Sequence, residues 1–140
     1  MDQEEIDKPY IERRVAEWAN RIDALYSIVQ DALSGMREIS TSMSRSISMN
    51  EELMQKYSVP GRELPILDIK KNGQIIATLK PIGLWVIGAN GRVDLLSEKG
   101  SYILVDHAEH GATPDWKVFT PSNRTKSESF DANFIRRAVK

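Results

Sequence analysis

Residues 11–43 read IERRVAEWANRIDALYSIVQDALSGMREISTSM, with apolar side chains at alternating steps of four and three residues. This spacing is typical of an amphipathic helix that packs lengthwise on another helix or along a sheet. Pro9 fits only a first helical turn, so we expect the helix to begin near Lys8–Ile11. We predict that it continues to about Ile39. The spacing is followed by Ile11, Val15, Trp18, Ile22, Leu25, Val29, Ala32, Met36, Ile39 and Met43.

A serine-rich stretch follows the predicted helix. Residues 40–48 carry hydroxyl side chains that compete for backbone hydrogen bonds and weaken a helix, so we interpret them as a linker. A phosphorylation or recognition tract is the alternative interpretation. Ser48-Met49-Asn50-Glu51 matches a capping box, which predicts a short helix through Tyr57 that Pro60-Gly61 stops. The helical part of the chain is therefore expected to span residues 8–57.

From residue 64 the sequence pattern changes from helical to extended. Asn72-Gly73 is the pair that most easily forms a two-residue hairpin turn, and Ala89-Asn90-Gly91 predicts a second hairpin. Connections this short require antiparallel neighbours. We predict a meander of five to six strands within residues 64–120, followed by a helix over 130–139. The expected strands are 66–71, 74–80, 84–88, 92–97, 102–106 and 116–120.

Two of the predicted strands are apolar on both faces. Residues 84–87 read LWVI and residues 102–105 read YILV, whereas a sheet with one wet face should alternate apolar and polar side chains. We therefore expect the long helix to cover one face, and the C-terminal segment or a second subunit to cover the other. The predicted fold is a single α+β domain over residues 1–140, with the long helix on the sheet and a short C-terminal helix.

Composition argues against several classes of protein. The 140 residues include 19 basic and 20 acidic side chains, a balance that argues against broad nucleic-acid binding. The chain has no cysteine, which excludes disulfides, thiolate catalysis and cysteine-ligated metals. No apolar run approaches the roughly 20 residues that span a bilayer, and residues 1–8 do not resemble a secretory signal. We expect a cytoplasmic protein without a membrane association. The chain contains no phosphate-binding glycine motif, so we expect no cofactor.

One stretch concentrates side chains that can do chemistry. Both histidines of the chain, His107 and His110, lie in the sequence Asp106-His107-Ala108-Glu109-His110. Imidazole and carboxylate groups together bind zinc, manganese or iron, so Asp106, His107, Glu109 and His110 are candidate metal ligands. The alternative interpretation is a polar strand end that enters an exposed loop.

Residues 91–96 (GRVDLL) and 102–108 (YILVDHA) resemble two adjacent strands of the PD-(D/E)xK nuclease core. In that family paired carboxylates hold magnesium, and a lysine two residues after the second acid orients the attacking water. The resemblance implies that Asp94 and Asp106 bind a divalent metal. Ala108 stands at the position of the lysine, and Gly111-Ala112-Thr113-Pro114 replaces the expected helix. Hydrolysis is therefore in doubt, because the group that would orient the water is missing.

These patterns support three functional hypotheses. The first is a non-catalytic protein-interaction protein, such as an adaptor, an inhibitor or an immunity-type partner, that self-associates as a homodimer; surplus apolar surface in a small chain usually forms an interface. Its expected interaction seam is Ile11, Val15, Trp18, Ile22, Leu25, Val29 and Met36. The alternative is a metal-dependent nuclease-like enzyme or phosphoesterase that uses Asp94, Asp106, His107 and His110. The third is a small-ligand binding module.

Overall fold

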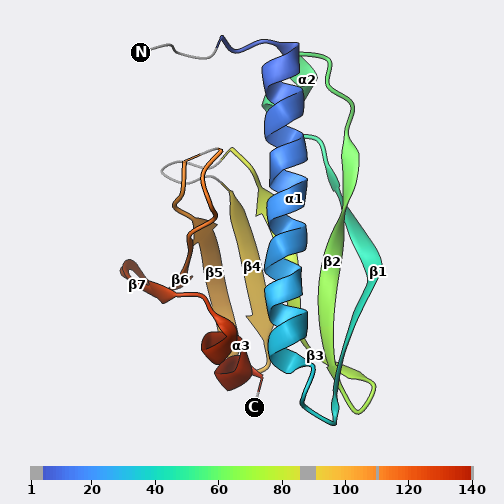
Figure 1. Ribbon diagram of the computed structural model, residues 1–140, viewed down its shortest axis with the longest axis vertical. Helices are drawn as coiled ribbons and strands as arrows, with labels where there is room; N and C mark the ends of the chain where they lie inside the picture. Colours follow the sequence, from blue (N-terminus) through green and yellow to red (C-terminus); the bar gives the residue numbers. More distant parts are fainter. Residues whose placement is uncertain (1–4, 86–90, 110, 140) are drawn as a thin grey trace.

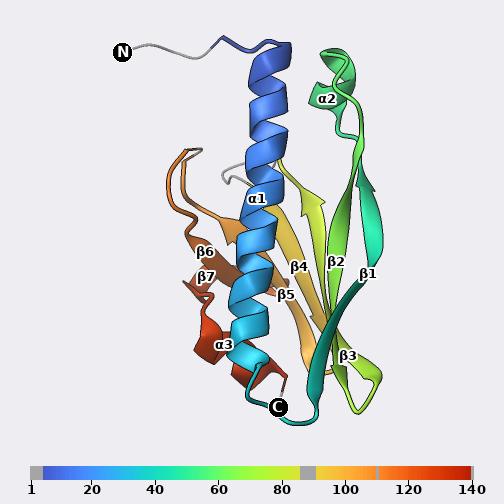
Figure 2. The same cartoon turned by 45° about the vertical axis from the view of Figure 1, so that its right-hand side comes forward.

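The computed structural model describes residues 5–85, 91–109 and 111–139. One long helix and one short helix lie on the same side of a seven-stranded sheet, so the α+β class predicted from the sequence is confirmed (Figures 1 and 2). The elements in chain order are α1 (Lys8–Leu33), β1 (Ile39–Met49), α2 (Glu52–Lys56), β2 (Arg62–Lys71), β3 (Gln74–Gly83), β4 (Arg92–Ser97), β5 (Gly100–Asp106), β6 (Trp116–Thr120), β7 (Asn123–Ser129) and α3 (Ala132–Ala138).

Helix α1 begins where the sequence predicted and ends earlier. The Asp7 side chain caps it by accepting a 3.0 Å hydrogen bond from the backbone N–H of Tyr10, and Pro9 lies in the first turn. The expectation that the helix continues to about Ile39 is wrong. The chain leaves the helix at Ser34, whose backbone N–H and hydroxyl both bond to the carbonyl of Asp31, and Gly35 follows in a turn. No helix in the described part of the chain is long and apolar enough to cross a membrane.

The seven strands are all antiparallel and follow one another across the sheet in chain order. The hairpin between β2 and β3 turns at Asn72 and Gly73, with φ values of 52° and 81°. Both residues therefore adopt the positive φ angles that a type I′ turn requires, which confirms the predicted hairpin.

Strand β1 replaces the predicted linker at residues 40–48, which makes that interpretation wrong. It pairs with β2 from Ile39 opposite Lys71 to Met49 opposite Arg62. Hydroxyl side chains disfavour a helix but leave the backbone free to pair with a neighbouring strand. The predicted helical part over residues 8–57 is therefore interrupted by a strand.

The capping box at Ser48-Met49-Asn50-Glu51 is also wrong, because Ser48 belongs to β1. Helix α2 begins after Glu51, whose side chain makes no capping bond. The Glu51 carboxylate instead accepts hydrogen bonds from the backbone N–H groups of Leu84 and Trp85, at 3.0 to 3.2 Å. It thus holds the chain where it leaves β3.

The strand count differs from the expected five to six for two further reasons. The predicted strand at 84–88 is not seen in its described part, because Leu84 and Trp85 form a bend after β3; residues 86–88 lie outside the described residues. Strand β3 instead pairs directly with β4, Leu79 opposite Leu95. Residues 123–129, between the last predicted strand and the predicted C-terminal helix, form the additional strand β7, which pairs with β6 through Lys117 opposite Ser129.

The core lies between the sheet and the two helices α1 and α3. Tyr26 of α1 donates a 2.7 Å hydrogen bond to the carbonyl of Pro65, and burial raises the pKa of its hydroxyl. Phe134 of α3 meets Tyr102 of β5 edge to face, with ring centroids 5.2 Å apart. Helix α3 therefore covers the same face as α1 and packs beside it, which corrects the expectation that the C-terminal segment covers the opposite face (Figure 2).

Candidate functional site

The predicted metal cluster contains a buried ion pair. Asp106, fully buried at the end of β5, accepts a hydrogen bond from Arg21 of α1 through its Oδ2 atom. Arg21 is only 5% exposed, and its guanidinium also donates to the carbonyls of Glu109 and Ala112. A buried charge is tolerated only when it is paired and hydrogen-bonded, and this pair meets both conditions.

The other Asp106 oxygen is occupied as well. Oδ1 accepts from the backbone N–H groups of Ala108, at 3.0 Å, and Asp115, at 2.8 Å. Glu17 of α1 accepts a 2.7 Å hydrogen bond from the backbone N–H of Gly111. Two side chains of α1 thus hold the loop that connects β5 to β6, and we call Glu17, Arg21 and Asp106 the loop clamp. The arrangement positions backbone and leaves Asp106 no oxygen without a donor.

The two acids of the nuclease resemblance lie on opposite faces of the sheet. Asp94 is opposite Ile103 in the β4–β5 register, so it shares a face with Ile103 and Val105, whereas Asp106 points toward α1. The Asp94 carboxylate is also paired with Arg92, at 2.8 and 3.2 Å. The structure therefore does not bring Asp94 and Asp106 together.

The remaining metal candidates are not assembled into a ligand set. The His107 ring packs against Phe119, with centroids 5.9 Å apart, and Glu109 contributes its backbone carbonyl to Arg21. His110 lies outside the described residues. Across the described ranges there is no group of three or more acidic or histidine side chains placed to share a metal ion.

The proposed interaction seam lies inside the chain. Ile11, Ile22, Leu25 and Val29 are fully buried against the sheet, and Val15 and Trp18 are nearly so. Met36, beyond the end of α1, is half-buried. A helix stripe that packs on its own sheet cannot also serve a second subunit without unfolding, so self-association would need a different surface.

A cluster that the sequence did not reveal lies on the face without helices. Arg45 of β1 donates to both carboxylate oxygens of the buried Asp68, at 2.9 and 2.6 Å, and the Thr78 hydroxyl donates to Asp68 at 2.8 Å. The bond from Arg45 holds the pKa of Asp68 below its usual range. These residues come from three neighbouring strands, so only the strand register brings them together.

The sheet is open at both edges, and the two edge strands differ in charge. β1 has 11 residues, ISTSMSRSISM, and its one charged residue, Arg45, is paired with Asp68. β7 has 7 residues, NRTKSES, of which three are charged. Each edge presents a row of backbone groups that have no strand partner among the described residues.

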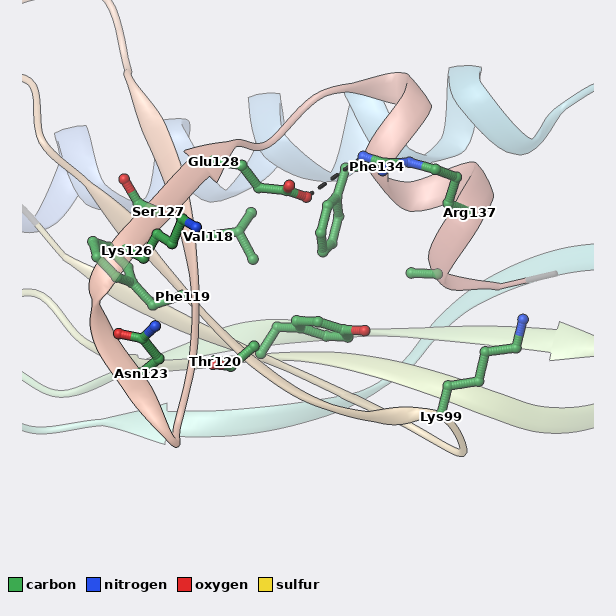
Figure 3. A pocket seen from close by; sticks show the side chains of 12 residues that line it. Lys99, Val118, Phe119, Thr120, Asn123, Lys126, Ser127, Glu128, Phe134 and Arg137 are labelled. Atoms are coloured by element: carbon green, nitrogen blue, oxygen red, sulfur yellow. Dashed lines mark hydrogen bonds and ion pairs between the residues drawn. The ribbon is translucent and has the colours of Figure 1, made fainter.

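A cleft of about 460 Å³ opens between β5, β6, β7 and α3 (Figure 3). Its lining combines apolar side chains such as Val118 and Phe134 with charged ones at the mouth, among them Lys126, Glu128 and Arg137. The cleft could not be predicted from the sequence, because no strand was predicted at β7 and the position of β7 relative to α3 depends on the whole sheet.

Comparisons with known proteins do not add to this geometry. No protein-family model, no curated protein and no solved structure matches the chain.

Proposed function

We propose that this chain is a non-catalytic protein-interaction protein that self-associates by pairing β1 of one copy with β1 of a second copy. The observation that carries the proposal is the edge of β1, whose one charged side chain, Arg45, is paired with Asp68. Proteins usually protect a sheet edge with charged side chains, proline or a covering segment, because an unprotected edge pairs with other strands. β1 contains no proline, and Asp68 neutralises its one arginine.

The composition of β1 favours a second copy as the partner. An antiparallel pair of identical strands about a two-fold axis is self-complementary, and it would oppose serine, threonine and methionine side chains without like charges. Met43, which is 48% exposed in the middle of the strand, would be covered. The bulge between Ser42 and Arg45 bends the edge, so we place the flat pairing on either side of it.

The other surfaces support self-association less well. The seam residues of α1 are already buried in the core of a single chain, so they are not available to a second copy. The β7 edge would bring its own charged side chains against those of a second copy, which is the arrangement that discourages edge pairing.

The experiment places one positive charge on each edge in turn. Ser44→Lys charges the exposed middle of β1, and Thr125→Lys makes the same kind of change at an exposed position of β7. Light scattering across a protein concentration series should show the dimer mass for the wild type and for Thr125→Lys, and the monomer mass for Ser44→Lys. A wild type that stays monomeric at high concentration, or equal effects of the two variants, would contradict the proposal.

A further inference from the structure

The cleft beside α3 has an apolar floor. Tyr102 of β5, Val118 of β6 and Phe134 of α3 form it, and the edge-to-face contact between Tyr102 and Phe134 fixes the two rings at one end. In Figure 3 the Phe134 ring points from α3 into the cleft, with Val118 beside it. Covering a floor of this kind with an apolar group is favourable, because water is released from both surfaces.

The mouth of the cleft is positively charged. Lys99, Lys126 and Arg137 surround it, and Glu128 is the one acidic side chain in the lining, so the charges sum to +2 from three cations and one anion. Among the described residues, neither the Lys99 nor the Lys126 ammonium group has an ion-pair or hydrogen-bond partner within the lining. This surplus attracts an anion to the mouth over several ångströms.

Glu128 shows how a carboxylate can be received. Its Oε1 atom lies 3.5 Å from an Arg137 nitrogen, a long contact between two side chains that are 53% and 66% exposed. An exposed ion pair of this kind contributes little stability, so a second carboxylate can replace it at small cost. Arginine can then bind that carboxylate through two parallel hydrogen bonds.

We infer that the cleft binds a small monocarboxylate with an apolar body, the apolar part lying on Val118 and Phe134 and the carboxylate replacing Glu128 on Arg137. The volume of about 460 Å³ lies within the range of roughly 300–1,000 Å³ that small-molecule sites occupy. Two sources share this chemistry, a free fatty acid and the C-terminal residue of a peptide. The inference is independent of self-association, because β1 lies at the opposite edge of the sheet from β7.

The test is a calorimetric titration supported by NMR chemical shifts. Octanoate below its micelle concentration represents the fatty acid, and an acetylated tripeptide that ends in phenylalanine represents the peptide. The control for octanoate is octyltrimethylammonium, which carries the opposite charge. The control for the tripeptide is its amidated form, which has no charged terminus. We expect saturable binding of at least one carboxylate with shifts at Val118 and Phe134, and no comparable binding of its control. The carboxylate that binds more tightly identifies the source.

Two variants change the affinity in opposite directions. Arg137→Gln removes the receiving group and should weaken binding at least tenfold, whereas Glu128→Gln removes the competing carboxylate and should strengthen it severalfold. Lys56→Gln, a loss of charge in α2 at the far end of α1, should have no effect (Figure 1). Absence of saturable binding for both carboxylates, equal binding of the controls, or an affinity that neither Arg137→Gln nor Glu128→Gln alters would overturn the inference.

Discussion

Gly91 lies directly beneath the ring of Trp18. Its φ of +114° disfavours any residue with a side chain, and a Cβ atom placed there would lie 2.1 Å from Cζ3 of the indole. Gly73 also has a positive φ, +81°, but a Cβ atom there would meet nothing within 4 Å. Substitution of Gly73 therefore tests backbone strain alone, whereas substitution of Gly91 tests backbone strain and packing together.

We predict that Gly73→Ala lowers the free energy of unfolding by about 1 kcal/mol, the cost of a positive φ for an L-residue. Gly91→Ala should cost about 1–3 kcal/mol more, because the indole must also move. Urea denaturation followed by far-UV circular dichroism measures both. Equal losses for the two variants would mean that Trp18 does not pack on Gly91.

Asp68 makes the free energy of unfolding depend on pH in the acid range. Its pKa is lowered in the folded chain, chiefly by the hydrogen bonds from Arg45. A group of this kind contributes stability that is present above its unfolded pKa, about 3.9, and is lost as the pH falls through the lower folded value. We predict that Asp68→Asn is less stable than the wild type at pH 7 and that the difference shrinks below pH 4. A difference that stays constant down to pH 2 would contradict this origin.

Helix α1 is joined to the loop after β5 by the loop clamp. We predict that Arg21→Met costs about 3–5 kcal/mol, because it leaves the Asp106 carboxylate buried without its partner. Asp106→Asn alone should also destabilise, and the double variant should lose much less than the sum, since the two residues share one interaction. Additive losses in thermal or urea unfolding would show that the two side chains act separately. Glu12→Gln, on an exposed position of α1, is the control.

The elements that the sequence predicted correctly are those with a local signal. The seam of α1 repeats over many residues, and Asn72-Gly73 fixes its own turn, so neither needs the rest of the chain to be known. β1 was missed although its serines alternate with larger side chains, because Ile39 and Met43 also continue the helical spacing of α1 and the serines were interpreted as a linker. β7 was missed because its residues, NRTKSES, include no apolar side chain. As edge strands, both are ordered mainly by backbone pairing with β2 and β6.

The candidate site was less predictable for a related reason. Asp106 was singled out from its neighbours in sequence, but its role depends on Arg21, which is 85 residues away and lies on a different element. Side chains alternate between the two faces of a sheet, so the β4–β5 register, in which Asp94 is opposite Ile103, places Asp94 on the face opposite Asp106. A list of polar residues near a strand end cannot distinguish a metal ligand from a clamp until the partner helix is placed.

At the scale of the whole molecule, α1 connects the early and late parts of the chain. Its Tyr26 bonds to β2, its Trp18 ring lies 6.1 Å from that of Trp116 in β6, and Arg136 of α3 donates a 3.0 Å hydrogen bond to the carbonyl of Ala32. The hydrophobic core includes residues of α1, α2 and α3 and of β1 to β6. Residues 8–57, the predicted helical part, could therefore not separate from the sheet without exposing this core to water.

We therefore predict that the chain unfolds as one cooperative domain. Tryptophan fluorescence reports the contact between Trp18 and Trp116 together with the surroundings of Trp85, whereas far-UV circular dichroism reports the helices and strands throughout. The two probes should give the same urea midpoint, and the calorimetric and van't Hoff enthalpies should agree when the Ser44→Lys variant is used, because self-association is then suppressed. Two transitions, with the helix signal lost before the tryptophan contact, would mean that residues 8–57 and the sheet are separate units.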